Sequence, residues 1–293
     1  MASLKIPLLS GLLGLGLTVL PALIQPPSTA TAPLLSPADQ VRFRQTLNMA
    51  QQQNLAAQPL GQTVQAIARQ YLGAPYRAGL LDQSPTERLV ISLQQFDCVL
   101  FVESVLALAR TVMTQRPSPA TFVNQVKAQR YRDGTLLSYC GRLHYFSDWI
   151  ADNERRGLVQ NVTQPLGGIP LKKPLNFMTQ HRSSYPQLKG RAEFTCIAAV
   201  ESRLASEPRY YIPTANIRAV YPKLQAGDVV AIATKVPGLD VTHTGLLERR
   251  TDGGVGLLHA SPAGAVTRAQ DLQTYVSQVP EAIGIIVARP LTR

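Results

Sequence analysis

The chain has 293 residues, and its 29 Lys and Arg against 18 Asp and Glu give a formal net charge of +11. A strongly basic protein favours anionic partners, such as cell-wall glycan or phospholipid head groups. Because the basic residues are scattered, with no run interleaved with aromatic residues, nucleic acid is not the expected partner.

The first 32 residues have the pattern of a secretory signal peptide. Lys5 precedes an apolar stretch from Ile6 to Ile24, and the small residues 30–32 resemble a cleavage site. An uncleaved membrane anchor is the alternative, although Gly and Pro interrupt the apolar stretch. No later stretch approaches the roughly 20 apolar residues of a membrane-spanning helix. We therefore expect an exported protein of the periplasm or cell envelope, without stable membrane insertion once the signal is removed.

Helical patterns fill the next part of the chain. Ser36-Pro37-Ala38-Asp39 combines a capping residue, a proline at the first helical position and an acid, which predicts a helix to about Ala57. Residues 33–60 are therefore expected to form a lead-in with its helix, and residues 61–293 one domain. Further helices are expected over residues 63–72, 86–93, 98–115 and 119–130.

The stretch LQQFDCVLFVESVLALAR, residues 93–110, places a cysteine at the start of one of these helices. Asp97 is a good N-cap, and apolar residues recur at helical spacing after it. Cys98 would lie in the first turn, where the helix dipole favours the thiolate over the thiol. The alternative is a small buried cysteine at the start of a core helix.

Residues 131–222 are the least regular part of the sequence. Aromatic residues, prolines and glycines are dense there, and no helical or strand period is sustained. Long irregular stretches inside a domain are more often functional than idle. We therefore treat residues 131–222 as an insertion-rich region of the domain.

Short strand patterns follow, over residues 229–234, 242–249, 254–259 and 283–289. The letters TDGG between the second and third of these predict a hairpin turn. Because helices come first and strands last, the order indicates an α+β domain.

Two of the four histidines, His243 and His259, fall in strands joined by this turn, so their imidazoles could come close on one sheet face. A nucleophilic cysteine needs a base, and the base needs a partner that holds its orientation. The alternatives are ordinary satisfied or exposed histidines, or zinc bound by two histidines and a cysteine. No short Cys-x-x-Cys or His-x-x-x-His spacing supports a metal site, and we expect neither a metal nor another cofactor.

Three cysteines are an odd number for an oxidising compartment, so at least one is unpaired or bonded between chains. If Cys140 and Cys196 pair, Cys98 is the free thiol. The sequence does not determine this connectivity.

Five motifs in order resemble the NlpC-type papain-like cell-wall hydrolases: YLGAPYRAG, FDCVLFVESVLALA, AGDVVAIA, VTHTGLL and LLHAS. The stretches RYRDGTLLSYCGRLHYFSDWIADN, NFMTQHRSSYPQL and GLDVTHTGLL are similar to the insertions of one branch. That branch was first described as a domain of unknown function and later assigned N-acetylmuramoyl-L-alanine amidase activity. The resemblance covers about residues 60–290. It implies a papain-like core: N-terminal helices with the nucleophile at a helix start, a large irregular insertion, then an antiparallel sheet carrying the histidines.

The implied activity is a cysteine-dependent hydrolysis of the N-acetylmuramoyl-L-alanine bond in peptidoglycan or muropeptide fragments. Cys98 would be the nucleophile, its pKa lowered by the helix dipole and an imidazolium so that it is a thiolate at working pH. His243 would be the base and His259 would orient it.

Four further residues are expected to contact the substrate. Tyr76 is implied as a second oxyanion donor beside the Cys98 amide, its alternative being an aromatic residue packed on the core. Arg142, His144 and Phe146 are expected to contact the sugar or lactyl portion, with structural packing as their alternative. A stem-peptide endopeptidase of the same superfamily and a non-catalytic wall-binding module remain open as rival functions.

Overall fold

The computed structural model of the protein describes residues 35–135 and 138–292. These residues belong to one compact unit, residues 33–293. The expected signal peptide therefore lies outside the described residues. Within the described ranges, no helix has both the length and the apolar character needed to cross a membrane.

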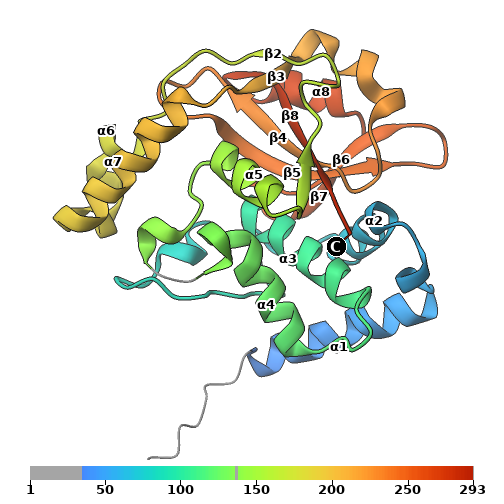
Figure 1. The fold of residues 1–293 in the computed structure, drawn as a ribbon. Coiled ribbons are helices and arrows are strands. Elements are labelled where there is room, and N and C mark those ends of the chain that lie inside the picture. Colours follow the sequence, from blue (N-terminus) through green and yellow to red (C-terminus); the bar gives the residue numbers. More distant parts are fainter. Residues whose placement is uncertain (1–34, 136–137, 293) are drawn as a thin grey trace, which may run out of the picture. The chain divides into compact units, whose positions relative to one another are not determined.

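An antiparallel sheet forms the C-terminal part of the unit (Figure 1). Its strands are ordered β2-β3-β8-β4-β5-β6-β7, and β1 pairs with β8 outside this path. The strands are β1 (Val159–Asn161), β2 (Ile169–Pro170), β3 (Tyr210–Pro213), β4 (Val229–Thr234), β5 (Val241–Arg249), β6 (Val255–Ala260), β7 (Val266–Ala269) and β8 (Ala282–Pro290). The four expected strands are confirmed as β4, β5, β6 and β8, whereas β1, β2, β3 and β7 were not expected.

The helices are α1 (Pro37–Gln52), α2 (Leu60–Gln70), α3 (Cys98–Val112), α4 (Pro119–Arg130), α5 (Phe146–Arg155), α6 (Phe177–Gln180), α7 (Arg191–Ser206) and α8 (Leu272–Gln278). Side-chain caps explain where several of them begin, because each cap satisfies an amide of the first turn. The Ser36 side chain accepts from the Asp39 amide, and the Ser118 side chain accepts from the Thr121 amide, both at 3.1 Å.

Together, these helices and the antiparallel sheet confirm the expected α+β class.

The helix expected over residues 86–93 is wrong. This segment has no regular secondary structure, because its backbone groups bind side chains that lie far away in the sequence. The Leu93 amide donates to Asp39 Oδ1 at 2.8 Å, and the Val90 carbonyl accepts from Arg130 Nη1. Such long-range bonds replace the local ones that a helix would need.

Residues 131–222 are more regular than expected, since they contain α5 and α7. In α5 the buried residues Phe146, Trp149, Ile150 and Asn153 recur at helical spacing. That period is short and lies among glycines and prolines, which explains why it was missed.

A disulfide between Cys140 and Cys196 ties the short turn Tyr139–Gly141 to helix α7, across 56 residues of sequence. Cys98 is the free cysteine. A small cluster of buried side chains, including Leu175, Leu188 and Leu204, packs around the disulfide. The bond therefore fixes one part of the insertion-rich region, residues 131–222, which we call the middle region, against another part of it.

The sheet has an apolar layer on each face. Val229, Ala231 and Leu246 pack with the helices α1 to α4, whereas Val230, Ile232 and Leu247 pack with α8. Figure 1 shows α8 on the side of the sheet away from α3. Because side chains alternate along a strand, each strand contributes to both layers.

Candidate active site

Cys98 is the first residue of α3, at the point where the helix meets the sheet. Asp97 has extended backbone angles, and its Oδ1 accepts a hydrogen bond from the Leu100 amide at 2.8 Å. Every residue from Leu100 to Val112 is buried, so the core holds the helix in place. The partly exposed Cys98 is therefore presented from a rigid element.

The turn that contains Tyr76 lies directly beside the segment leading into Cys98. The Phe96 amide donates to the Pro75 carbonyl at 3.0 Å, and the Arg77 amide donates to the Phe96 carbonyl at 2.9 Å. Burial raises the pKa of Tyr76, and the charges of Cys98 and Asp97 raise it further. The Tyr76 hydroxyl and the Cys98 thiol are therefore close enough to interact electrostatically.

His243 of β5 and His259 of β6 meet in the interior. His243 Nε2 lies 2.8 Å from His259 Nδ1, and the two rings stand edge to face at 4.9 Å between centroids. Both side chains are buried, with 7% and 2% exposure. The expectation that adjacent strands bring the two imidazoles together is confirmed. Because Nε2 of His243 is engaged by His259, its Nδ1 remains to act on a neighbour.

Cys98 lies close to β5, the strand that carries His243, just beyond the end of the β5–β6 ladder. The ladder joins Leu246 to Leu258 and runs to Arg249 and Val255. Just outside it, the Thr244 backbone amide is directed at Cys98 and lowers the pKa of its thiol. The sulfur therefore lies against the residue that follows His243.

The expected lowering of the Cys98 pKa is wrong for this structure. Burial raises the pKa of the thiol to about 12, and the Asp97 carboxylate beside it adds to the rise. The amides of Thr244, Val99 and Cys98 act in the opposite direction but are outweighed. The first turn of a helix favours a thiolate only where solvent loss does not cost more.

The histidines are uncharged in the resting site. Burial lowers the pKa of His243 to about 3, and the nearby His259 lowers it further. Burial also lowers the pKa of His259 to about 4. At neutral pH the site therefore holds a thiol and two neutral imidazoles, one of which has a ring nitrogen available to accept a proton.

Tyr275 of α8 is a site residue that the sequence reading missed. Its hydroxyl lies 3.4 Å from His259 Nδ1, and its ring centroid lies 4.6 Å from that of His259. Burial raises the pKa of Tyr275 to about 12, and the Cys98 charge raises it further. A signal was present, since Asp271 caps this helix and apolar Leu272 and Val276 follow at helical spacing.

A cavity of about 180 Å³ is lined by Asp97 and Val99, the two residues on either side of Cys98 in the chain. Arg142, His144 and Phe146 line it, so the structure brings these three residues to the start of the Cys98 helix. The middle region therefore supplies one wall of this cavity.

Arg142 and His144 are also held by contacts within the protein. Arg142 Nη2 lies 2.6 Å from Asp82 Oδ1, and the guanidinium stacks over the Tyr139 ring at 4.9 Å. His144 Nε2 lies 2.8 Å from the Tyr139 carbonyl, and burial lowers the pKa of His144 to about 3. Replacing Arg142 would therefore affect stability as well as any substrate contact.

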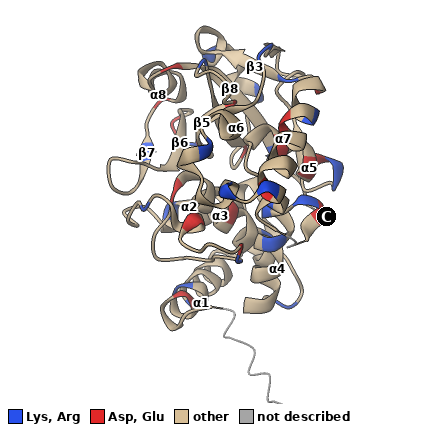
Figure 2. Ribbon diagram, turned by 90° about the vertical axis from the view of Figure 1, so that its left-hand side faces the viewer, with Lys and Arg blue, Asp and Glu red and all other residues tan. Residues whose placement is uncertain are grey.

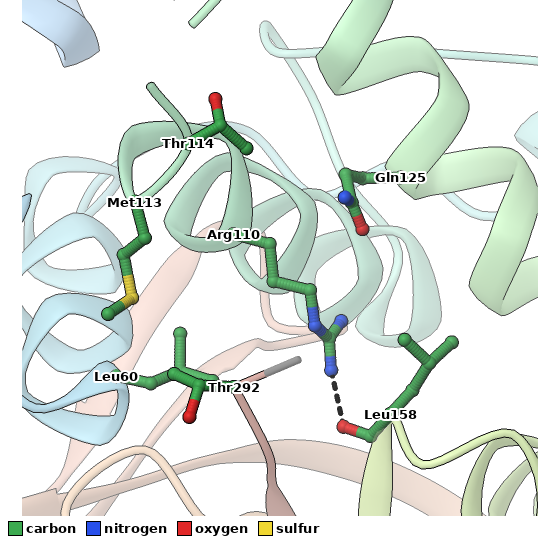
Figure 3. A pocket seen from close by; sticks show the side chains of 7 residues that line it. All are labelled: Leu60, Arg110, Met113, Thr114, Gln125, Leu158 and Thr292. Atoms are coloured by element: carbon green, nitrogen blue, oxygen red, sulfur yellow. Dashed lines mark hydrogen bonds between the residues drawn. The ribbon is translucent and has the colours of Figure 1, made fainter. Parts of the chain in front are cut away.

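A second cavity, of about 160 Å³, lies at the other end of α3 (Figure 3). Arg110 lines it and donates through Nη2 to the Leu158 carbonyl at 2.6 Å. Twelve residues of helix separate Arg110 from Cys98, or about 18 Å at 1.5 Å per residue. This cavity is therefore not part of the cysteine site.

Figure 2 shows Lys and Arg on several elements, α5 and α7 among them. Residues 35–135 and 138–292 contain no group of three or more His, Cys, Asp or Glu side chains arranged to hold a metal ion.

The chain is similar to a protein family and to several solved structures. A family model described as AmiA-like, N-acetylmuramoyl-L-alanine amidase-like, matches residues 66–285. The crystal structure of an N-acetylmuramoyl-L-alanine amidase from Bacteroides uniformis is 31% identical with a TM-score of 0.74, covering 79% of this chain and 99% of that one.

Two further solved structures have the same fold. A Bacteroides fragilis protein provisionally named a xylanase is 33% identical with a TM-score of 0.70, covering 76% of this chain and 98% of that one. Protein LPG0564 from Legionella pneumophila is 19% identical with a TM-score of 0.63, covering 86% and 95%. None of the curated proteins compared with the chain matches it.

Proposed function

The chain belongs to the AmiA-like, N-acetylmuramoyl-L-alanine amidase-like family, and from this premise we propose that it is a cysteine-dependent amidase. Its substrate is the amide bond between muramic acid and L-alanine in peptidoglycan or muropeptide fragments. The observation that carries the proposal is the 2.8 Å contact between His243 Nε2 and His259 Nδ1, on the strand whose next amide is directed at Cys98.

The first half of the reaction forms a thioester. His243 Nδ1 takes the thiol proton while Cys98 Sγ attacks the carbonyl carbon of the lactyl group. For this, His243 carries its resting proton on Nε2, and this N–H donates a hydrogen bond to His259 Nδ1. The Nδ1 of His243 is then unprotonated and can accept the thiol proton. His243 then gives the proton to the leaving nitrogen of L-alanine, and the C–N bond breaks.

The second half releases the sugar acid. His243 takes a proton from water while the oxygen attacks the thioester carbon. The C–S bond breaks and the sulfur recovers the proton. The negative oxygen of each tetrahedral intermediate accepts hydrogen bonds from the Cys98 amide and the Tyr76 hydroxyl.

The Cys98 thiol and the His243 imidazole are both uncharged in the resting enzyme, which is consistent with these steps. A thiol with a pKa near 12 and an imidazole with a pKa near 3 do not exchange a proton on their own. The transfer becomes favourable as sulfur bonds to the carbonyl carbon and charge moves to the oxygen. Proton transfer and attack are therefore coupled.

The order of helices, cysteine and histidine strands supports placing the chain in the NlpC-type papain-like superfamily. We also propose that it is exported to the periplasm or cell envelope, on the pattern of residues 1–32. In that location an anionic wall polymer suits the net charge of +11.

Three other functions are separable from this one. A stem-peptide endopeptidase would use the same residues but cut between amino acids. A wall-binding module would bind without releasing products. A glycoside hydrolase, which generally uses two carboxyl groups, would cut between sugars and leave the muramoyl–alanine bond intact.

The test is to digest a defined muropeptide and weigh the products. An amidase releases a sugar that ends in a free lactyl carboxylate and a peptide that begins with L-alanine. Cys98→Ala should abolish release, and His181→Ala, which changes an exposed histidine, should leave it unchanged. Products in which L-alanine stays attached to the sugar would identify an endopeptidase, and normal turnover by Cys98→Ala would exclude the cysteine mechanism.

A further inference from the structure

Arg130, the last residue of α4, has a hydrogen-bond donor that nothing in the described residues satisfies. Its side chain is 2% exposed. Nε lies 2.6 Å from Glu103 Oε2, and Nη1 donates to the Val90 carbonyl. Nη2 has no hydrogen-bond partner among residues 35–135 and 138–292. A buried donor left unsatisfied costs about 1–3 kcal/mol, so its retention calls for a functional reason.

The unsatisfied donor belongs to a side chain that lines the cavity beside the nucleophile. Arg130 borders the same space of about 180 Å³ as Asp97 and Val99, the two neighbours of Cys98 in the chain. A ligand group in this cavity would therefore reach Arg130 while the rest of the molecule lies over the thiol.

The charges around the cavity select an uncharged ligand group. Arg130 is paired with Glu103, and Arg142 is paired with Asp82 at 2.6 Å. Asp97 also lines the cavity, and its Oδ1 accepts from the Leu100 amide. A ligand carboxylate would meet the Asp97 charge, whereas a neutral carbonyl oxygen can accept from Arg130 Nη2 without that repulsion. An amide group suits both partners, since its N–H can donate to Asp97.

The cavity lies on the acyl side of the scissile bond. His243 must protonate the leaving nitrogen, so the L-alanine side of the substrate runs towards the histidines. Neither His243 nor His259 lines the cavity. The muramoyl side therefore runs towards Asp97 and Arg130.

We propose that this cavity binds the N-acetyl group of the muramoyl sugar, with the acetyl oxygen accepting from Arg130 Nη2 and the amide nitrogen donating to Asp97. This assignment rests on the proposed amidase function and names the substrate group that the middle region and α4 recognise. Arg130 is thereby a binding residue. The acetyl oxygen accepts the hydrogen bond that Nη2 makes to none of the described residues.

The test compares two substrates on the wild-type enzyme. One is N-acetylmuramoyl-L-alanyl-D-isoglutamine, and the other is its analogue with a hydroxyl in place of the acetamido group. We expect kcat/KM to be about 10–100-fold lower for the analogue, since it leaves Arg130 and Asp97 unpaired. Equal kcat/KM values would overturn the assignment.

A variant links the effect to Arg130. Arg130→Lys keeps the charge beside Glu103 but removes Nη2, so the kcat/KM ratio of the two substrates should fall about tenfold, and the Asp97 contact accounts for any discrimination that remains. The matched control is Arg203→Lys, which changes an arginine paired with Asp148 outside the cavity and should retain the full discrimination. A folded Arg130→Lys enzyme with the same kcat/KM ratio as the wild type would overturn the proposal.

The wild-type comparison stands alone if Arg130→Lys does not fold. Cleavage of both substrates at the muramoyl–alanine bond with equal kcat/KM rejects the acetyl subsite and leaves the amidase function intact. Failure to cleave either substrate at that bond rejects the amidase function itself.

Discussion

Asp240 Oδ2 accepts a hydrogen bond from the Ser147 backbone amide at 2.6 Å, and this contact joins the first turn of α5 to the start of β5. Asp240 is 1% exposed, and its Oδ1 also accepts from the Val241 amide at 2.8 Å. Phe146, one residue before Ser147, lines the cavity beside Cys98, and His243 lies three residues after Asp240. The cavity wall and the histidine strand are therefore positioned by one carboxylate.

Removing this carboxylate should loosen both elements. We expect Asp240→Ala to lower the free energy of unfolding by about 1–3 kcal/mol, because the Ser147 and Val241 amides lose their acceptor. Asp240→Asn keeps an acceptor oxygen and should cost less. Denaturant unfolding of the two variants measures the difference, and equal stability of Asp240→Ala and the wild type would show that the contact is not structural.

Cys98 should react slowly at neutral pH and faster in base. With the thiol pKa near 12, the alkylation rate by iodoacetamide should rise about tenfold per pH unit between pH 7 and 10, because only the thiolate attacks. The Cys98→Ser variant should take up no label without reductant, since Cys140 and Cys196 are bonded to each other. A rate that is constant from pH 7 upwards would mean that the thiolate already exists in the resting enzyme.

The two histidines should differ in their contribution to the rate. Only His243 carries the proton, so His243→Ala should lower kcat/KM on a muropeptide by about 10²–10⁴-fold. His259→Asn keeps a group that can hydrogen-bond to the His243 ring and should lose less. Circular dichroism should show both variants folded. If folded His259→Asn were as inactive as His243→Ala, the two roles would have to be exchanged.

Stability should fall as the pH drops below about 6.5. The pKa of His243 and His144 is lowered to about 3 and that of His259 to about 4, whereas an unfolded histidine titrates near 6.5. Between these values the unfolded chain binds protons that the folded chain does not, so acid favours unfolding. Each histidine should contribute about 1.5 kcal/mol of this loss between pH 6.5 and 5.

Unfolding by urea at a series of pH values measures this loss. The His243→Gln/His259→Gln double variant lacks two of the titrating groups, so its stability should depend less steeply on pH than that of the wild type. Identical slopes for the two proteins would show that the imidazole pair accepts protons in the folded state.

Local patterns were sufficient wherever a few neighbouring residues decide the structure. Asp97 and the apolar period after it predicted a helix from Cys98, and the structure begins α3 at that residue. The same kind of pattern failed at residues 86–93, where Asp39 and Arg130 bind the backbone from 54 and 40 residues away. Arg130 could not be recognised as a candidate binding residue from its own stretch, because its free donor depends on which atoms surround it.

The sequence by itself determined the elements that bear the chemistry: a cysteine after a capping aspartate, two histidines in strands joined by a tight turn, and an aromatic middle region. It did so because caps, turns and apolar periods act over a few residues. Only the tertiary structure decided the pairing of Cys140 with Cys196 and the contact of Tyr275 with His259. The direction of the Cys98 pKa was decided in the same way, because burial depends on segments that are distant in the chain and meet only in the folded protein.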